Sequence, residues 1–189
     1  MNIRTAPAPT GFRAVARDWL AENFPASLTG RHEDWVIHQP LYPEGDDWAA
    51  WKAAMADKVL AACGGDVDGK RVAVLGVTFK PNTDDMRDAP SLVILPKLQE
   101  WGADVHAHDP EGTEQASPLL PGVQFHDDPY SCIEGADALV IITEWERFRA
   151  LDLERVRATM AGQVVVDLRN IYRAPRMSEL GFVYTSVGR

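Results

Sequence analysis

Cysteine is scarce in this 189-residue sequence, which contains only Cys63 and Cys132. Two cysteines are too few for a disulfide scaffold of the kind that stabilises small secreted proteins. The sequence also lacks a run of roughly 20 apolar residues, the length that a membrane span needs. Its first 19 residues have no apolar core of a secretion signal. We therefore expect a soluble protein in the reducing cytoplasm.

Positive charge is also in short supply. The 19 lysines and arginines stand against 28 aspartates and glutamates, which gives a formal net charge of -9. A chain that repels phosphate overall gains nothing at a nucleic-acid or anionic membrane surface. We therefore expect neither partner, and any phosphate-binding site has to be local.

The composition otherwise matches ordinary globular protein, with 46% hydrophobic and 25% charged residues. A chain of this length has room for one good core and an appendage. Apolar residues at helical spacing predict an amphipathic helix over 10–20 and a second helix that starts near residue 46 and stops at Gly64-Gly65. Residues 25–45 are broken by proline and glycine and predict turns.

Beyond Lys70 the residue pattern changes to short apolar runs that alternate with stretches of helical periodicity. We expect buried strands and intervening helices, the strands over 71–77, 104–108, 138–142 and 164–167, with an edge strand over 182–185, and the helices over 92–102, 129–135 and 152–160. This alternation predicts an α/β fold with a doubly wound, mainly parallel, Rossmann-like sheet, preceded by a short helical segment.

Ligands of open parallel sheets bind outside the carboxyl ends of the strands. Two cations follow predicted strands there, Lys80 and Arg169, and Phe79 offers a flat apolar face. Arginine grips phosphate bidentately and lysine acts as a point charge, so the pair suits an anionic molecule that contains a diphosphate. The alternative is that both cations are solvated or form internal ion pairs with neighbours such as Asp84, Asp85 or Asp167.

The loop that begins at Gly76 is not a dinucleotide fingerprint, because LGVTFK lacks the second and third glycines. A Rossmann NAD site on this strand is therefore disfavoured. Asp109 stands where such folds place a ribose-binding carboxylate, but the missing glycines favour a structural turn role in the sequence HDP.

Neither cysteine has a plausible base beside it in sequence, and we expect both thiols to be inert. The five histidines show no metal-ligand spacing with the cysteines, although His106 and His108 could share one face of a strand. Packing or solvation is the expected role of the histidines, and no metal site is predicted.

Residues from about 57 to 189 contain four runs that carry a family resemblance. The runs are GKRVAVLGVTFKPNTDDMRDAPSLVILPKLQEWGADVHAHDP, GADALVIITEWERF, VVVDLRNIY and GFVYTSVGR. They resemble the UDP-glucose/GDP-mannose dehydrogenase family, and TFKPNTDDMRDAPS and DLRNIY are similar to the carboxyl-terminal, UDP-sugar-binding domain of its bacterial UDP-glucose 6-dehydrogenase branch. The resemblance implies a domain over 58–189 that takes UDP-glucose or a related UDP-sugar.

That family oxidises UDP-glucose to UDP-glucuronate in two NAD-dependent steps through a cysteine thiohemiacetal and thioester. By motif, the resemblance implies that Phe79 and Lys80 in TFK and Arg169 in DLRN contact the UDP-sugar. It also implies that Arg87 in DDMRD reaches NAD held by another domain.

Several family motifs have no counterpart in this sequence. They are the GxGYVG nucleotide loop, the catalytic cysteine in GGxCF, and the lysine, asparagine and aspartate that serve that cysteine. Covalent aldehyde oxidation has no route without a nucleophile. We therefore expect the chain to be inactive alone, with no catalytic residue of its own, and a separate catalytic domain as a possible partner.

Residues 1–57 resemble another family. The runs GFRAVARDWLAENFPASLTGR and DWAAWKAAMADK are similar to the amino-terminal helical segment of acyl-CoA dehydrogenases, although the rest of that fold is missing and no flavin is expected. An alternative function is a non-catalytic interaction module, in which Trp19, Trp48 and Trp51 dock on a partner or pair two copies. A recombined gene product without independent activity is the other alternative.

Overall fold

The computed structural model of the protein describes residues 46–187, with side chains from residue 49 onward. The chain divides within helix α2 (Asp46–Ala62) into two units, Met1–Ala54 and Met55–Val187. The helix predicted over 10–20 lies outside the described residues, whereas the helix predicted from residue 46 is α2. The domain boundary predicted after residue 57 stays a prediction.

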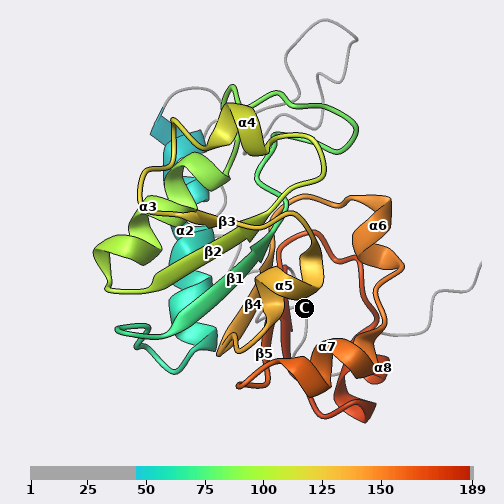
Figure 1. The fold of residues 1–189 in the computed structure, drawn as a ribbon. Helices are drawn as coiled ribbons and strands as arrows, with labels where there is room; N and C mark the ends of the chain where they lie inside the picture. The colour runs from blue at the N-terminus through green and yellow to red at the C-terminus, as the bar shows by residue number, and fades with distance from the viewer. Residues whose placement is uncertain (1–45, 188–189) are drawn as a thin grey trace, which may run out of the picture. The chain divides into compact units, whose positions relative to one another are not determined.

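Six parallel strands form the sheet of the second unit, in the spatial order β3-β2-β1-β4-β5-β6. In chain order the strands are β1 (Arg71–Leu75), β2 (Asp104–His108), β3 (Gln124–Phe125), β4 (Ala138–Ile141), β5 (Val164–Asp167) and β6 (Val183–Ser186). The strand order reverses direction between β1 and β4, which is the doubly wound arrangement (Figure 1). The predicted fold class is confirmed.

The strands form where the sequence carries short, β-branched apolar runs. β1 pairs with β2 and β4 in register, so that Val72 lies beside Val105 and Ala138. Every residue of β4 is buried, as expected for the centre of a sheet that is covered on both faces.

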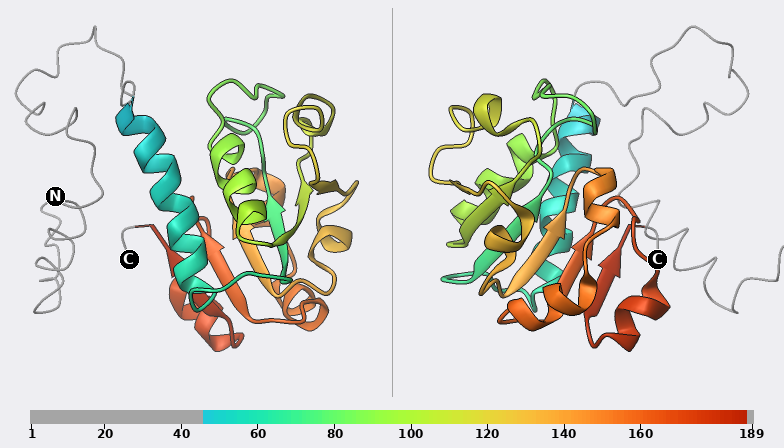
Figure 2. Two further views of the ribbon diagram at one scale, coloured as in Figure 1. Left: turned by 90° about the vertical axis from the view of Figure 1, so that its left-hand side faces the viewer. Right: turned by 45° about the vertical axis from the view of Figure 1, so that its right-hand side comes forward.

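Helices connect the strands. They are α3 (Ser91–Glu100), α4 (Thr113–Ala116), α5 (Pro129–Ile133), α6 (Glu146–Arg149), α7 (Leu153–Thr159) and α8 (Ala174–Glu179). Figure 2 shows α5 and α7 on one face of the sheet and α3 on the other. Asp128 and Asp152 cap α5 and α7 through two backbone N–H groups each.

The core on the α5 face joins alternate residues of the strands to the helices that cover them. Leu75, Leu139 and Val165 come from the sheet, and Phe148 and Met177 come from α6 and α8. Each of these side chains is almost fully buried, which contributes roughly 1.5–3 kcal/mol apiece. This packing holds all six strands with their carboxyl ends at one edge of the sheet.

Candidate functional site

The candidate site lies at the carboxyl ends of β1, β2, β4 and β5. The four loops that begin there span 76–90, 109–112, 142–145 and 168–173. They flank the reversal of strand order between β1 and β4. At such a reversal the loops on either side run in opposite directions and leave a crevice, in which ligands of open parallel sheets bind.

Asp109 ties the second loop to the first. Its Oδ2 accepts hydrogen bonds from the backbone N–H groups of Val77 at 2.7 Å and Thr78 at 3.2 Å. Its Oδ1 accepts from the N–H groups of Glu111 at 3.1 Å and Gly112 at 2.8 Å. The carboxylate is buried and supplied with donors on both oxygens, so it has the structural role that the sequence favours over ribose binding.

The loop over 142–145 also bonds to Asp109 and to the loop over 76–90. Trp145 donates from its indole Nε1 to Asp109 Oδ2 at 3.3 Å, and the hydroxyl of Thr143 donates to the carbonyl of Thr78 at 2.7 Å. Gly76 allows this approach, because a Cβ there would lie 2.5 Å from the Cβ and 2.9 Å from the Cα of Thr143. Gly76 also has a φ of 84°, a conformation that favours glycine.

Arg169 forms an ion pair with Glu144 from the neighbouring loop. The guanidinium donates from Nε and Nη2 to the two oxygens of Glu144, with 2.8 Å between Nη2 and Oε1. The side chains are 31% and 28% exposed. Burial is the largest single effect and acts to raise the pKa of the Glu144 carboxyl. The hydrogen bonds and the charge of Arg169, with smaller contributions from the Glu144 backbone and Arg149, together lower that pKa. The internal ion pair weighed from sequence is therefore present, with Glu144 as the partner.

Backbone contacts fix the loop that carries Arg169. The buried carboxylate of Asp167 accepts from the N–H of Arg169 at 3.0 Å and, through its second oxygen, from the N–H of Tyr172 at 3.0 Å. Asn170, next to Arg169, adopts a φ of 55°, which asparagine tolerates better than most residues. The two oxygens of Asp167 thus hold the backbone at Arg169 and at Tyr172.

Lys80 and Phe79 lie in the first loop. The N–H of Phe79 donates to the carbonyl of Asp85 at 2.9 Å, and the hydroxyl of Thr78 donates to the carbonyl of Lys80 at 3.2 Å. Phe79 is half-buried and Lys80 is exposed. Within residues 46–187, the Lys80 ammonium makes neither a hydrogen bond nor an ion pair, and its charge helps to lower the pKa of Asp85.

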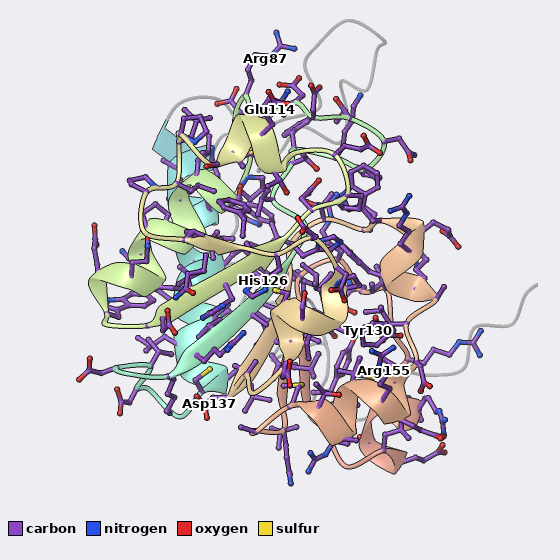
Figure 3. The ribbon with its side chains drawn as sticks, viewed as in Figure 1. Arg87, Glu114, His126, Tyr130, Asp137 and Arg155 are labelled. Carbon is purple, nitrogen blue, oxygen red and sulfur yellow. The ribbon has the colours of Figure 1, made fainter. Side chains whose placement is uncertain are left out.

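Arg87 lies farther along the first loop and projects from the ribbon (Figure 3). It donates from Nε and Nη2 to Asp85 at 2.9 and 2.8 Å, and its side chain is 89% exposed. The bonds from Arg87 lower the pKa of Asp85 to about 2. The Asp85 side chain is 27% exposed, and both residues line a pocket.

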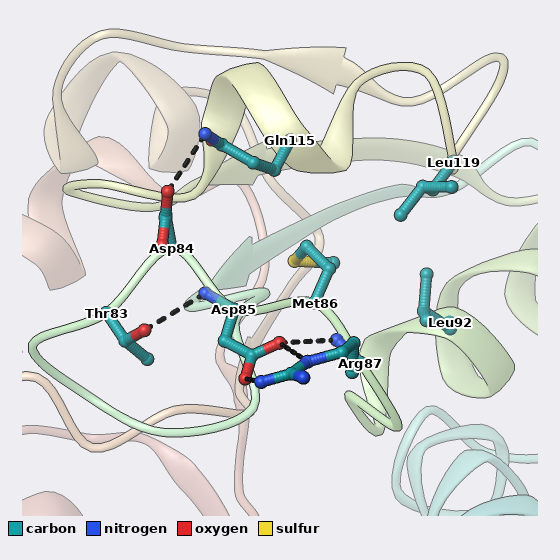
Figure 4. A pocket seen from close by; sticks show the side chains of 8 residues that line it. All are labelled: Thr83, Asp84, Asp85, Met86, Arg87, Leu92, Gln115 and Leu119. Atoms are coloured by element: carbon teal, nitrogen blue, oxygen red, sulfur yellow. Dashed lines mark hydrogen bonds and ion pairs between the residues drawn. The ribbon is translucent and has the colours of Figure 1, made fainter.

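That pocket has a volume of about 550 Å³ and is lined by residues 83–87, Leu92, Gln115 and Leu119 (Figure 4). Gln115 donates to Asp84 at 2.9 Å across it. Neither Phe79, Lys80 nor Arg169 lines the pocket. Arg87 is nevertheless linked to Phe79 through Asp85, whose carbonyl accepts the Phe79 N–H and whose carboxylate binds the Arg87 guanidinium. The NAD contact implied for Arg87 stays a prediction.

Neither cysteine has the properties of a nucleophile. Burial raises the pKa of the Cys132 thiol to about 12 and raises the pKa of Cys63 as well. Both are free thiols, and a thiol that stays protonated is a poor nucleophile. The expectation that both are inert agrees with these shifts.

The three histidines within residues 46–187 do not gather as metal ligands. Across residues 46–187, no group of three or more His, Cys, Asp or Glu side chains could hold a metal ion. His106 and His108 share the α5 side of β2, as the strand alternation predicts, and His106 bonds to His126 and Asp104. In the same part of the chain, no helix has the length and apolar content to cross a membrane.

Glu144, Thr143 and the clamping role of Asp109 were not predicted from sequence. Glu144 is 25 residues from Arg169 and follows a different strand, so no local spacing indicates the pair. The one available signal was its position in the loop that follows β4, at the strand ends where ligands of parallel sheets bind.

Comparison with known proteins identifies relatives of this region. Residues 73–174 match the model of the UDP-glucose/GDP-mannose dehydrogenase family, UDP binding domain. A UDP-glucose 6-dehydrogenase from Rhizobium meliloti is 54% identical over 138 residues, covering 73% of this chain and 32% of the relative. One from Pseudomonas aeruginosa is 46% identical over 127 residues, 64% of this chain and 28% of the relative. The chain thus spans about a third of the length of these relatives.

Solved structures give the same picture. An NDP-N-acetyl-D-galactosaminuronic acid dehydrogenase from Methanosarcina mazei superposes with a TM-score of 0.66 at 27% identity, over 83% of this chain and 34% of the other. A UDP-glucose dehydrogenase from Pyrobaculum islandicum gives 0.57 at 33% identity, over 66% and 28%. The resemblance of residues 1–57 to acyl-CoA dehydrogenases stays a prediction.

Proposed function

Because the chain belongs to the UDP-glucose/GDP-mannose dehydrogenase family and its residues 73–174 form the family's UDP binding domain, we propose that it binds a UDP-sugar, UDP-glucose or a close relative. The ligand lies across the loops that follow β1 and β5. Lys80 and Arg169 contact the diphosphate and sugar, and Phe79 supplies an apolar face. The observation that carries the proposal is the position of these two cations at the strand ends, on loops that Asp109 and Asp167 fix.

The proposal separates binding from chemistry. The relatives that are UDP-glucose 6-dehydrogenases are about three times as long as the matched region. Neither thiol of the present chain suits a covalent step, because burial raises the pKa of both. The 189 residues therefore bind substrate without oxidising it, and oxidation needs a catalytic domain from outside this sequence.

Arg87 has a different role in the proposal. Its guanidinium is 89% exposed and is bound to Asp85. It contacts NAD that a catalytic domain holds, so the cofactor belongs to the assembled enzyme and not to this domain alone. A cytoplasmic location, where NAD and UDP-sugars are available and the two thiols stay reduced, completes the proposal.

Titration calorimetry on the full chain tests the proposal with UDP-glucose, UDP and ADP. We expect UDP-glucose and UDP to bind and ADP to bind much more weakly. Equal binding of all three, or no binding of any, contradicts the proposal.

A further inference from the structure

The ion pair of Arg169 and Glu144 uses one edge of the guanidinium. The bonds to Glu144 leave from Nε and Nη2, which form the side edge of the group. A guanidinium has five N–H donors in a fixed fork. Glu144 takes two of them.

The end edge of the same group stays open. Among residues 46–187, no side chain or carbonyl accepts a hydrogen bond from Nη1 of Arg169, and Nη1 is not enclosed as a buried, unpaired atom. One N–H of Nη1 and the second N–H of Nη2 are parallel and form the planar fork that matches two phosphate oxygens. With 31% of its side chain exposed, Arg169 can offer that fork to a ligand.

Glu144 is itself held in place by both neighbours in sequence. Thr143 on one side bonds to the carbonyl of Thr78, and Trp145 on the other bonds to Asp109. Its carboxylate stays ionised, because the bonds from Arg169 lower its pKa despite the opposing effect of burial. A fixed, charged carboxylate on one edge of a guanidinium defines the direction of the other edge.

We propose that Glu144 is a positioning residue for ligand binding, which orients Arg169 so that its end edge faces the diphosphate. The inference rests on the proposed UDP-sugar site and adds to it a residue that never touches the ligand. Its chemical consequence is selectivity for a ligand with two adjacent anionic oxygens over one without phosphate.

The competing interpretation is that Glu144 occupies the arginine and must be displaced by the ligand. A carboxylate in competition with a phosphate that binds end-on would occupy Nη1 and Nη2 together. The observed bonds use Nε in place of Nη1, which leaves the fork open. The two interpretations predict opposite effects on UDP affinity when the charge of Glu144 is removed.

The experiment is calorimetric titration of the full 189-residue chain with UDP and, as the phosphate-free probe, uridine. Glu144→Gln is compared with the parent and with Glu146→Gln, a matched control two residues away whose carboxylate is 91% exposed and 3.6 Å from Arg149. We expect UDP to bind Glu144→Gln about tenfold more weakly, the scale of one lost charge-assisted interaction. Uridine affinity and the control should be unchanged.

A double-mutant cycle separates positioning from general loss of structure. In an Arg169→Met background, Glu144→Gln should have no further effect on UDP affinity, because the group it orients is gone. Tighter UDP binding by Glu144→Gln, unchanged binding, or an equal loss in both backgrounds overturns the inference.

The outcomes also separate this inference from the proposed function. A parent chain that fails to bind UDP removes both. A parent that binds UDP and loses affinity with Arg169→Met, but not with Glu144→Gln, keeps the proposed site and removes only the positioning role.

Discussion

The imidazole rings of His106 and His126 share a hydrogen bond of 2.7 Å between Nδ1 and Nε2, and His106 Nε2 lies 3.0 Å from Asp104 Oδ2. These three hydrogen-bonded side chains link β2 to the residue after β3, which is His126 (labelled in Figure 3). Burial lowers the pKa of His126, and the nearby charges of His106 and Arg71 lower it further, while Asp128 acts in the opposite direction.

This shift predicts loss of stability in mild acid. The folded pKa of His126 lies below the reference value of 6.5, so the unfolded chain takes up the proton first as pH falls. The stability is fully present above that value and decreases as pH falls toward the folded pKa. Urea denaturation at pH 7.5, 6.5 and 5.5 should show the decrease, with a smaller slope for His126→Asn. Equal slopes in parent and variant would contradict the assignment to His126.

Replacement of Asp109 tests the clamp between loops. Both oxygens accept only N–H or O–H donors, so the amide of Asp109→Asn must point its NH₂ at a donor in either orientation. We expect a loss of about 3 kcal/mol in the free energy of unfolding, measured by urea denaturation. Asp127→Asn, at an exposed position, is the control and should change it by less than about 0.5 kcal/mol.

Gly76 and Gly135 form a matched pair for testing the close approach of two loops. Both have positive φ, 84° and 71°, but an added Cβ meets Thr143 at Gly76 and nothing within 4 Å at Gly135. Gly135→Ala should destabilise by roughly 1–2 kcal/mol, the conformational part alone. Gly76→Ala should cost at least about 2 kcal/mol more, because backbone must move. Thermal and urea unfolding measure both, and equal losses would show that space at Gly76 is not limiting.

Ligand affinity tests the predicted site residues one at a time. Lys80→Ala and Arg169→Ala should each weaken UDP-glucose binding by about 1.5–3 kcal/mol, the range for a lost charge-assisted hydrogen bond. Arg87→Ala should leave the affinity nearly unchanged, because its proposed ligand is NAD on another domain. Calorimetry measures all three, and a variant that binds as the parent does removes that residue from the site.

Thiol labelling tests the assignment of the cysteines as inert. A thiol with its pKa raised to about 12 is protonated at pH 8, and Cys132 is also buried. Iodoacetamide at pH 8 should therefore leave Cys132 unmodified in the folded chain and modify it in 8 M urea, as read by peptide mass spectrometry. Rapid modification of native Cys132 would be inconsistent with the structure.

The sequence predicted the elements that have long or continuous apolar patterns. β2 (104–108) and β5 (164–167) were predicted to the residue, and β1 and β4 end two and one residues earlier than expected. The two-residue strand β3, the four-residue helices α4 and α6 and the six-residue helix α8 were missed. Such short elements hold fewer than two repeats of their hydrophobic period, which is too few to show a pattern, and tertiary contacts define them.

The same limit applies to the site. Position after a strand was enough to select Lys80 and Arg169, because strand ends follow from local pattern. The pairing of Arg169 with Glu144 depends on β4 and β5 lying side by side. Sequence reasoning placed these strands in one sheet but gave no order for them, so their cross-loop partners could not be derived.

The clamp at Asp109 has a kinetic consequence. Three loops are joined to one another through its carboxylate, so little chain entropy remains to be lost when a ligand binds. We expect association in one step at a rate set by diffusion and orientation, with no slow ordering phase. Differences in affinity among sugar nucleotides should then arise from how fast each one leaves.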